Sequence, residues 1–471
     1  MADPKFVPIP VHELDRFKPL LGERFAEIEE VARRARAGFA GRAIWHLSST
    51  ARGGGVAELL STLLPYARDA GVDVRWVVLR EGREFFCITK RLHNHLHGDG
   101  GDGGALDEDA RRIYDAVSEA NVEALGPQMQ KGDIVYLHDP QTAGMIAPLC
   151  ERGLRVVWRC HVGIDRPNDL VRGAWAFLRP YVERAEAYVF SRREYVWDGL
   201  DRDKVWLMPP VIDPFSSKNQ DLEPEVTAAI LKQIGLAPDG LEGPPTFERA
   251  DGTPGRVERR AEILQEERVP DEAKVVAQVS RWDRLKDPHG LLEMLERHLD
   301  DPELHLVVAG PDTGGVADDP EGAAVYGDVA ETWRRLPDGV RRRAHLVSLP
   351  MLDVEENGAM VNAIQRRADV VVQKSVAEGF GLTVAEAMWK RRAVVGSRVG
   401  GIQDQIVDGK SGILIDDSRD LAAFARAIQR LLADPDRAQA MGEAAHQRVV
   451  DEYLAVPRLQ EYVQHLAALI D

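Results

Sequence analysis

The chain has 471 residues, which suggests two or three domains at roughly 100–200 residues per domain. Hydrophobic residues make up 44% and charged residues 29%, a globular balance that excludes a wholly disordered chain. Asp and Glu number 77 against 60 Lys and Arg, and the formal net charge of −17 argues against a nucleic-acid binder and against docking on an anionic membrane.

Apolar runs and helical segments alternate through the first half of the chain. Residues 11–36 are predicted to form one or two surface helices ahead of the core. A strand at 42–48 leads into three glycines at 53–55. A helix at 56–70 and a strand at 72–79 complete a βαβ unit, which implies a parallel sheet. Further strands are predicted at 134–138, 156–160, 187–190 and 205–208.

This alternation stops at Pro209-Pro210, because adjacent prolines cannot continue a helix or a central strand. We therefore predict an N-terminal domain over residues 1–210 and a C-terminal domain over residues 211–455. Residues 238–260 are rich in Gly, Pro and charge, which indicates an exposed insertion or hairpin whose role the sequence does not assign.

The second domain has its own alternation of strands and helices. Its strands are predicted at 274–280, 305–309, 344–349, 370–373, 393–396 and 412–415. The fold class predicted for the chain is α/β, with two Rossmann-like doubly wound domains. Ligands of such domains bind at the carboxyl ends of the strands, and a cleft between the domains is the expected site.

Localisation is predicted from what the sequence lacks. No apolar run approaches the roughly 18 residues of a membrane span, and the N-terminus has no basic flank followed by an apolar core. Cys87, Cys150 and Cys160 are too few and too far apart for a disulfide framework or a zinc site. We expect a cytoplasmic protein with reduced thiols, no structural metal and no membrane or nucleic-acid partner.

Two segments could hold phosphate. The glycines at 53–55 let a ligand approach a helix N-terminus closely, although a tight βα turn explains them equally well, and they fit no dinucleotide or Walker motif. Arg281 and Lys286 follow a predicted strand, where a guanidinium and an ammonium suit a diphosphate. The alternative for this pair is a solvated loop with ion pairs to Asp283 and Asp287.

The most informative segment follows the strand at 370–373. Glu378 and Glu386 are separated by seven residues that include Gly-Phe-Gly, and a helix is predicted to begin near Leu382. The helix N-terminus suits a diphosphate, and the carboxylates suit pairs of sugar hydroxyls. The alternative is a capped helix that carries Glu386 as an ordinary surface residue.

Together these motifs resemble a retaining glycosyltransferase of the GT4 family, with a GT-B fold whose two domains face a central cleft. Gly400-Gly401 downstream completes the order and spacing of the family's motifs. Finer segments are similar to the trehalose glycosyltransferring synthases of that family. These segments are His138-Asp139-Pro140-Gln141, Trp158-Arg159-Cys160-His161, Pro167-Asn168, Gln373-Lys374-Ser375 and Ala387-Met388-Trp389-Lys390.

The resemblance implies a site made by both domains. The implied catalytic residues are His161, Arg281, Lys286 and Glu378. The implied donor and nucleotide site consists of Arg281, Lys286, Glu378, Gly379, Phe380, Gly381, Leu382 and Glu386. The implied acceptor and sugar site consists of Gly54, Gly55, Asp139, Gln141 and His161. The family's C-terminal helix, here 456–471, would pack back on the N-terminal domain.

The resemblance also implies the reaction. Glucose would move reversibly from NDP-glucose to glucose, with retention, to give α,α-trehalose. The donor, ADP-, UDP- or GDP-glucose, is a co-substrate, and no cofactor is required; Mg²⁺ is compatible with the chemistry but is not implied. The base, the direction in vivo and the oligomeric state, including a homodimer, stay open.

One departure from the family pattern concerns the acceptor. The segment after the Arg-Cys pair is His161-Val162-Gly163-Ile164-Asp165, so the aspartate expected two residues after the histidine is missing. This leaves open a GT4 glucosyltransferase with a different small acceptor. A trehalose phosphorylase-like enzyme, which would use inorganic phosphate, is the other alternative.

Overall fold

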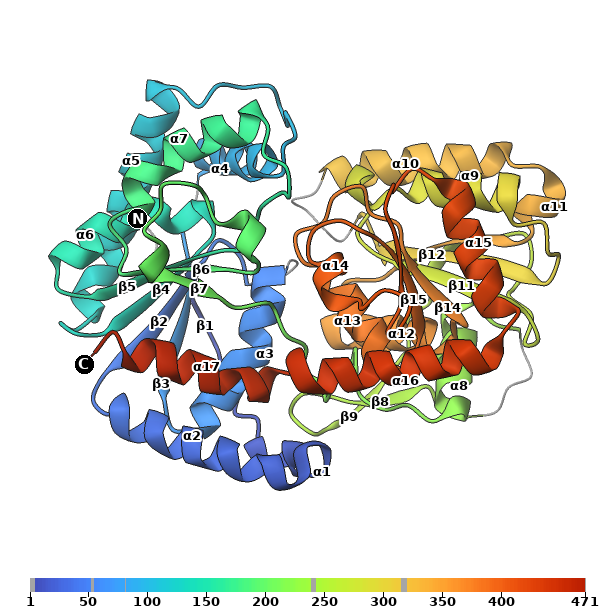
Figure 1. Ribbon diagram of the computed structural model, residues 1–471, viewed down its shortest axis with the longest axis horizontal. Helices are drawn as coiled ribbons and strands as arrows, with labels where there is room; N and C mark the ends of the chain where they lie inside the picture. The colour runs from blue at the N-terminus through green and yellow to red at the C-terminus, as the bar shows by residue number, and fades with distance from the viewer. Residues whose placement is uncertain (1–4, 52–54, 81, 239–242, 315–319, 471) are drawn as a thin grey trace. The chain divides into compact units, whose positions relative to one another are not determined.

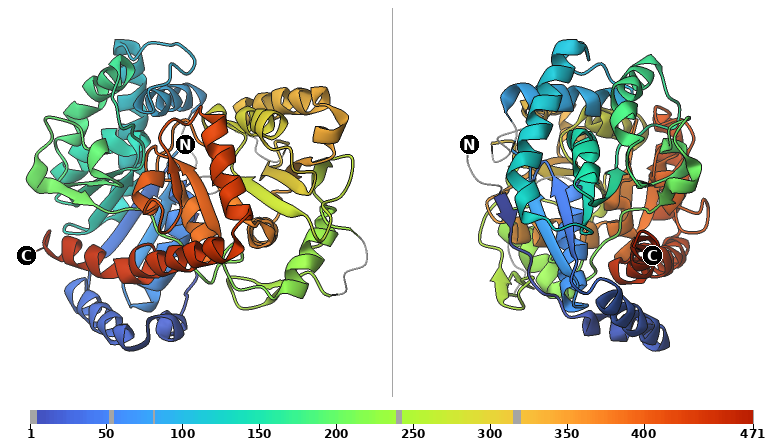
Figure 2. Two further views of the ribbon diagram at one scale, coloured as in Figure 1. Left: turned by 45° about the vertical axis from the view of Figure 1, so that its right-hand side comes forward. Right: turned by 90° about the vertical axis from the view of Figure 1, so that its left-hand side faces the viewer.

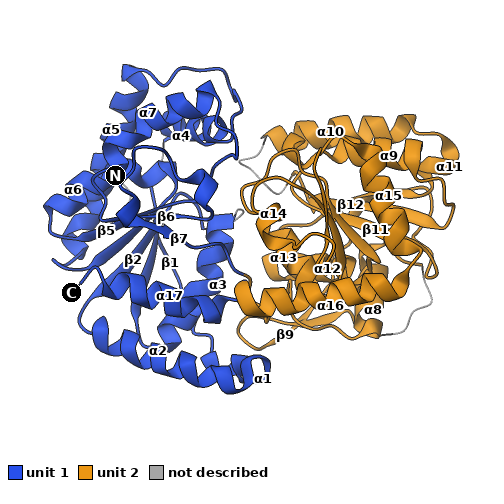
Figure 3. Ribbon diagram, in the orientation of Figure 1, with its two compact units in different colours: residues 1–211, 453–471 blue, residues 212–452 orange. Residues whose placement is uncertain are grey.

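The computed structural model describes residues 5–51, 55–80, 82–238, 243–314 and 320–470. The chain divides into two compact units: unit 1 comprises residues 1–211 and 453–471, and unit 2 comprises residues 212–452 (Figure 3). Each unit contains one seven-stranded sheet (Figure 1). The predicted fold class, two Rossmann-like α/β halves, is confirmed.

The sheet of unit 1 has the strand order β1-β3-β2-β4-β5-β6-β7. Only the edge strand β1 runs antiparallel to its neighbour. The strand order turns around between β2 and β4, which is the switch point where a doubly wound sheet binds ligands. The strands are β1 (Lys5–Val7), β2 (Ala43–Ser48), β3 (Asp73–Val78), β4 (Ile134–His138), β5 (Arg155–Cys160), β6 (Ala187–Phe190) and β7 (Val205–Leu207).

Helices cover this sheet, and α17 packs along α2 and α3 (Figure 2). Polar caps fix two helix starts: Asp107 accepts from Ala110 N, and Asn168 accepts from Val171 N. The α-helices are α1 (Lys18–Leu21), α2 (Phe25–Gly38), α3 (Gly55–Asp69), α4 (Arg83–Leu96), α5 (Glu108–Leu125), α6 (Ile146–Glu151), α7 (Asp169–Val182) and α17 (Ala455–Ala467). The 3₁₀ helices are η1 (Leu14–Phe17), η2 (Gly22–Arg24), η3 (Gly126–Gln128), η4 (Pro140–Met145), η5 (Arg193–Tyr195) and η6 (Arg202–Lys204).

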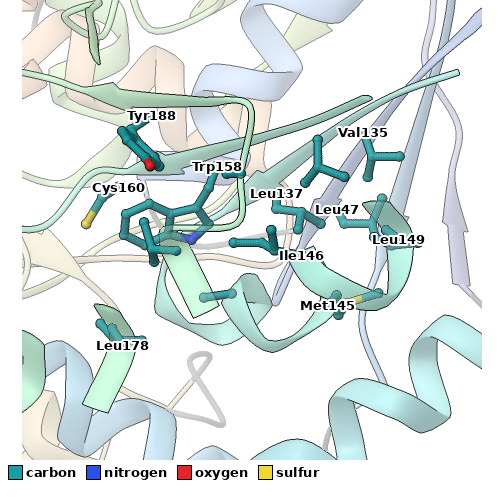
Figure 4. Close-up of a cluster of buried hydrophobic side chains, with 14 of the residues drawn as sticks. Leu47, Val135, Leu137, Met145, Ile146, Leu149, Trp158, Cys160, Leu178 and Tyr188 are labelled. Carbon is teal, nitrogen blue, oxygen red and sulfur yellow. The ribbon is translucent and has the colours of Figure 1, made fainter. Parts of the chain in front are cut away.

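The core of unit 1 lies directly beneath the strand ends that carry the predicted site. Leu47 and Leu137 from the central strands pack with Met145 from η4, and all three are 0% exposed (Figure 4). Trp158 belongs to the same cluster, and its indole Nε1 donates to the carbonyl oxygen of Asp139 at 3.0 Å. Trp158 is therefore a packing residue that also holds a residue of the site.

The sheet of unit 2 has the order β10-β13-β12-β11-β14-β15-β16, again with one antiparallel edge strand, β10. The parallel strands β11 and β14 pair directly, and the order of the strands reverses between them. This is the second switch point. The strands are β10 (Glu262–Leu264), β11 (Lys274–Val279), β12 (Leu304–Pro311), β13 (Ala344–Leu349), β14 (Val370–Gln373), β15 (Ala393–Ser397) and β16 (Ile413–Ile415).

The helices of unit 2 include two pairs that pack closely, α8 with α12 and α9 with α15. Asp353 starts α12 by accepting from Glu355 N and Glu356 N. The helices are α8 (Pro224–Ile234), η7 (Arg284–Lys286), α9 (Pro288–His298), α10 (Pro320–Arg335), α11 (Asp338–Arg341), α12 (Val354–Arg367), α13 (Leu382–Trp389), α14 (Ile402–Gln405), α15 (Leu421–Leu432) and α16 (Pro435–Glu452).

The Gly- and Pro-rich segment before β10 contains an antiparallel hairpin of β8 (Thr246–Glu248) and β9 (Pro254–Arg256). Phe247 is buried, and its ring occupies the space above Gly255, where an added Cβ would lie 2.5 Å from the ring. Arg249 Nη2 lies 2.7 Å from Asp353 Oδ2, which anchors the hairpin to the start of α12. The hairpin is therefore attached to the unit and is only partly exposed.

No helix within the described ranges is both long and apolar enough to span a membrane. The same ranges hold no group of three or more His, Cys, Asp or Glu side chains placed to bind a metal ion, and Cys87, Cys150 and Cys160 are free.

Candidate active site

Lys286 and Glu378 meet at the switch point of unit 2. Lys286 ends η7, just after β11, and Glu378 lies in the loop after β14. Lys286 Nζ donates to Glu378 Oε2 at 2.6 Å, and their side chains are only 12% and 10% exposed. The Ser375 hydroxyl donates to the same carboxylate oxygen at 3.2 Å. The fold thus brings together two residues that the sequence places far apart.

A buried polar network holds the backbone of Lys286. Gln278 of β11 donates from Nε2 to Lys286 O at 2.8 Å and accepts from Lys374 N at 2.8 Å. Lys374 is fully buried and forms an ion pair with Asp287. The other oxygen of Asp287 caps α9 by accepting from Gly290 N at 3.0 Å. Asp287 therefore pairs with Lys374 and not with Lys286, which leaves Lys286 to Glu378.

The Gly-Phe-Gly loop is held by hydrogen bonds from α14 and from the residue that precedes it. Gly381 caps α13 in the left-handed region, with φ +82°, which glycine adopts without strain. Gly401 N donates to Gly379 O at 3.1 Å, and Gln405 Nε2 donates to Phe380 O at 2.7 Å. An added Cβ on Gly401 would lie 2.6 Å from Phe380 Cα, so only glycine fits there. Leu382 follows as the first residue of α13.

Glu386 lies one turn into α13, as predicted, but its side chain is buried. Its Oε1 lies 3.2 Å from Nζ of Lys218, which comes from the segment before α8. Sequence reasoning missed Lys218 because that segment has no regular pattern. The ammonium group of Lys218 lies beside this buried carboxylate, and the two oxygens of a carboxylate can accept hydrogen bonds from a pair of hydroxyls.

Arg281 is the predicted phosphate ligand that the fold holds least firmly. Its side chain is 57% exposed, and its Nη2 lies 3.7 Å from Asp283 Oδ2. This loose ion pair with Asp283 is the alternative that the sequence had left open for Arg281. The long, exposed guanidinium has the freedom to turn toward a bound anion.

In unit 1, Asp139 follows β4 at the switch point and has a strained backbone, with φ +63°. Its Oδ1 accepts from His161 N at 2.7 Å, and its own N donates to Arg159 O at 2.7 Å. These bonds, with the one from Trp158, hold a conformation that costs about 1–3 kcal/mol, and such strain clusters at functional sites. Burial raises the pKa of Asp139 to about 7.

His161 follows β5 and is half-buried. Its Nε2 lies 3.4 Å from Nδ1 of His138, whose Nε2 lies 3.2 Å from Nδ1 of His46. Burial lowers the pKa of His46 to about 3 and lowers the pKa values of His138 and His161 well below the usual value. The positive charge of Arg159 adds to all three shifts. Sequence reasoning missed this row of three histidines, because histidines within apolar strands are typical of a protein core.

The other predicted sugar ligands lie close to Asp139 in the sequence or on α3. Gln141 is in η4, and its Oε1 is buried with no hydrogen-bond partner among the described residues. Gly55 is the first residue of α3, and an added Cβ there would meet nothing within 4 Å among the described atoms. Gly54 lies outside the described residues.

The structure explains the missing aspartate at position 163. An added Cβ on Gly163 would lie 2.3 Å from Cγ of the Tyr195 ring, so a larger side chain does not fit. Asp165 forms an ion pair with Arg192, whose side chain is only 5% exposed. Asp165 therefore has an ion-pair partner within the protein.

Comparisons with known proteins identify the family of the chain. Residues 46–197 match the family "Trehalose synthase, N-terminal domain", and residues 259–448 match "Glycosyl transferases group 1". The chain is 36% identical over 422 residues to a trehalose synthase of Thermococcus litoralis, with 89% of each chain covered. A trehalose phosphorylase of Grifola frondosa is more distant, at 25% identity over 429 residues, and covers 87% of this chain and 54% of its own.

Solved structures share the fold. An α,α-trehalose-phosphate synthase (UDP-forming) from Burkholderia vietnamiensis has a TM-score of 0.66 at 16% sequence identity, and the match covers 91% of this chain and 97% of that one. The chain therefore belongs to the trehalose synthase family and is a glycosyltransferase with the GT-B fold.

Proposed function

We propose that the protein is a retaining glucosyltransferase that moves glucose from an NDP-glucose to free glucose and forms α,α-trehalose reversibly. The observation that carries this proposal is the pair of Lys286 and Glu378 at the switch point of unit 2, beside the N-terminus of α13. A cation and a helix N-terminus are suited to a diphosphate, and a carboxylate is suited to sugar hydroxyls.

In this proposal unit 2 binds the donor. Lys286 and the exposed Arg281 contact the diphosphate, while Glu378 and the backbone from Gly379 through Leu382 bind the glucose and the phosphates. Glu386, which lies 3.2 Å from Nζ of Lys218, accepts from the ribose hydroxyls. Stabilisation of the charge on the departing diphosphate, by the preformed ammonium of Lys286 and by Arg281 once it has turned toward the anion, is usually the largest single contribution to the rate at such a site.

Unit 1 binds sugar hydroxyls in the same proposal. Asp139 and Gln141 orient a sugar. The buried Oε1 of Gln141, which has no hydrogen-bond partner among the residues that the structure describes, supports this role because buried acceptors are usually hydrogen-bonded. His161 hydrogen-bonds the donor glucose near its 6-hydroxyl. We favour attack from the face that the diphosphate leaves, with the leaving phosphate taking the proton of the acceptor hydroxyl, so no carboxylate is required as a nucleophile.

The acceptor side departs from the family pattern, because Gly163 and the Asp165–Arg192 pair alter the segment after His161. A different small acceptor is therefore the first alternative. A trehalose phosphorylase-like reaction is the second, and the buried pair of Glu386 and Lys218 argues against it, because inorganic phosphate has no ribose to bind.

The test is a product screen with purified protein. ADP-, UDP- and GDP-glucose are each incubated with glucose and with a panel of other small acceptors, and the products are identified by mass spectrometry. Trehalose from an NDP-glucose and glucose, and its breakdown when the matching NDP is added, support the proposal. Cleavage of trehalose by inorganic phosphate without any nucleotide would establish the phosphorylase instead.

A further inference from the structure

Three neighbouring strands of unit 1 each carry a histidine at or near the carboxyl end. His46 lies in β2, His138 ends β4, and His161 follows β5. The rings lie end to end in a row with nearly parallel planes: the interplanar angle is 26° between His46 and His138, and 18° between His138 and His161. His46 and His138 are buried, at 5% and 1% exposed. The row therefore runs from the interior of the unit to the half-buried ring of His161.

In both contacts of this row, Nδ1 of one histidine faces Nε2 of the next. Nδ1 of His46 faces Nε2 of His138 at 3.2 Å, and Nδ1 of His138 faces Nε2 of His161 at 3.4 Å. A neutral imidazole carries one N–H and one acceptor nitrogen. If His46 donates from Nδ1, then His138 and His161 must both carry their protons on Nδ1. If His161 donates from Nε2, all three must carry their protons on Nε2.

The constraint applies to neutral rings. Burial lowers the pKa of all three imidazoles, and the cation of Arg159 adds to each shift, so the neutral forms are favoured. Arg159 is itself 0% exposed and is fixed by its bond to Met208 O at 2.9 Å and by its bond to the hydroxyl of Tyr462. A cation held there disfavours any imidazolium in the row.

We propose that His46 and His138 form a relay that sets the tautomer of His161. Because Nε2 of His161 faces His138, Nδ1 is the ring nitrogen left for a ligand. The relay decides whether this nitrogen donates to a ligand or accepts from it. His46 and His138 are then positioning residues. Only the identity of the ligand, a hydroxyl of the donor sugar, rests on the proposed function.

The protein contains a useful comparison pair in unit 2. His305 Nδ1 lies 2.9 Å from His345 Nε2, and His345 Nδ1 lies 3.2 Å from Oε1 of Gln265. The contacts have the same direction as in unit 1, but the row ends on an amide and not on a predicted site residue. His305→Phe therefore removes a buried imidazole link of the same kind in the other unit and is the matched control for His46→Phe.

The first test needs no substrate. The protein is labelled with ¹⁵N-histidine, the tautomer of each ring is read from long-range ¹H–¹⁵N correlations, and the signals are assigned by single substitutions. We expect His46, His138 and His161 to share one tautomer in the wild type. In His46→Phe we expect His161 to become a mixture of tautomers, whereas His305→Phe leaves it unchanged. A different tautomer in any one of the three wild-type rings, or an unchanged His161 in His46→Phe, overturns the relay.

The second test uses kinetics and separates the relay from the proposed function. With an NDP-glucose donor, His46→Phe should lower kcat/KM about tenfold, the loss expected when one net hydrogen bond is weakened. With the corresponding 6-deoxy donor, wild type and variant should have equal kcat/KM. If His46→Phe lowers kcat/KM equally with both donors, the relay does not act on the 6-hydroxyl of the donor, and the proposal is overturned. If no donor is turned over by the wild type, the proposed function fails, and the tautomer measurement still decides the relay.

Discussion

Nζ of Lys286 lies 2.6 Å from Oε2 of Glu378, and this contact joins the loops that follow the adjacent parallel strands β11 and β14. Both side chains are nearly buried, so the pair is a preformed charge arrangement and not a surface ion pair. A diphosphate bound there would meet the ammonium group already in place. The protein would need little reorganisation to stabilise negative charge.

Lys286→Ala should lower the rate of glucosyl transfer by about 10²–10³, the usual effect of removing one fixed donor from a charge-stabilising site. Stability should also fall, because Glu378 is left without this partner, and Lys286→Ala combined with Glu378→Gln should recover stability but not activity. Lys274→Ala is the matched control, since Lys274 begins β11, the strand that precedes the loop of Lys286, and its Nζ lies 2.9 Å from Asp301 Oδ2. Wild-type turnover in Lys286→Ala would remove this lysine from the reaction.

Lys374→Met should destabilise the protein by about 3–5 kcal/mol, because removing one partner of a buried ion pair leaves the other charge uncompensated. Urea denaturation measures this loss. Asp287→Asn added to Lys374→Met should restore part of it. We also expect a raised KM for the donor, because the loop that carries Lys286 loses its tie to β14. An unchanged KM would mean that the network is purely structural.

Much of this arrangement was predictable from the sequence for a simple reason. The carboxyl ends of adjacent parallel strands meet at one edge, so a lysine after β11 and a glutamate after β14 have to be near each other once the strand order is known. Lys218 could not be found in this way, because its segment has no periodic pattern. The pairing of His46 with His138 could not be found either, because it depends on which strands are neighbours.

The edge strands of the two sheets also could not be predicted from the sequence. Strands β1 and β10 have three residues each and pair antiparallel with the outer strands of the two sheets. Such short runs show no clear alternation of apolar and polar residues. Each pairs with the exposed edge of a sheet that is formed by other parts of the chain. The hairpin of β8 and β9 was foreseen as a hairpin or an insertion, but its anchor on Asp353 depends on tertiary packing.

Gly163→Ala should destabilise the protein by about 1–3 kcal/mol, the typical cost of overpacking, because the added methyl group would meet the ring of Tyr195. Thermal unfolding measures the loss. Gly173→Ala is the control, since an added Cβ at Gly173 in α7 meets nothing within 4 Å. Adding Tyr195→Ala to Gly163→Ala should remove the steric part of the cost. If Gly163→Ala is as stable as the wild type, sterics do not explain the glycine at this position.

The raised pKa of Asp139 makes stability depend on pH in a definite direction. Burial raises this pKa from 3.8 to about 7, so the native state holds a proton that the unfolded chain loses between these values. The contribution of Asp139 to stability therefore falls as pH rises from about 4 to about 7, and it is constant above that range. Asp139→Asn carries no ionisable carboxyl, so its stability relative to the wild type should rise by about 4 kcal/mol between about pH 4 and about pH 7, at about 1.36 kcal/mol per pKa unit. Unfolding at a series of pH values measures the difference in stability between Asp139→Asn and the wild type. The control is Asp109→Asn, at an exposed position. A difference that does not change with pH would mean that burial does not hold the Asp139 carboxyl neutral.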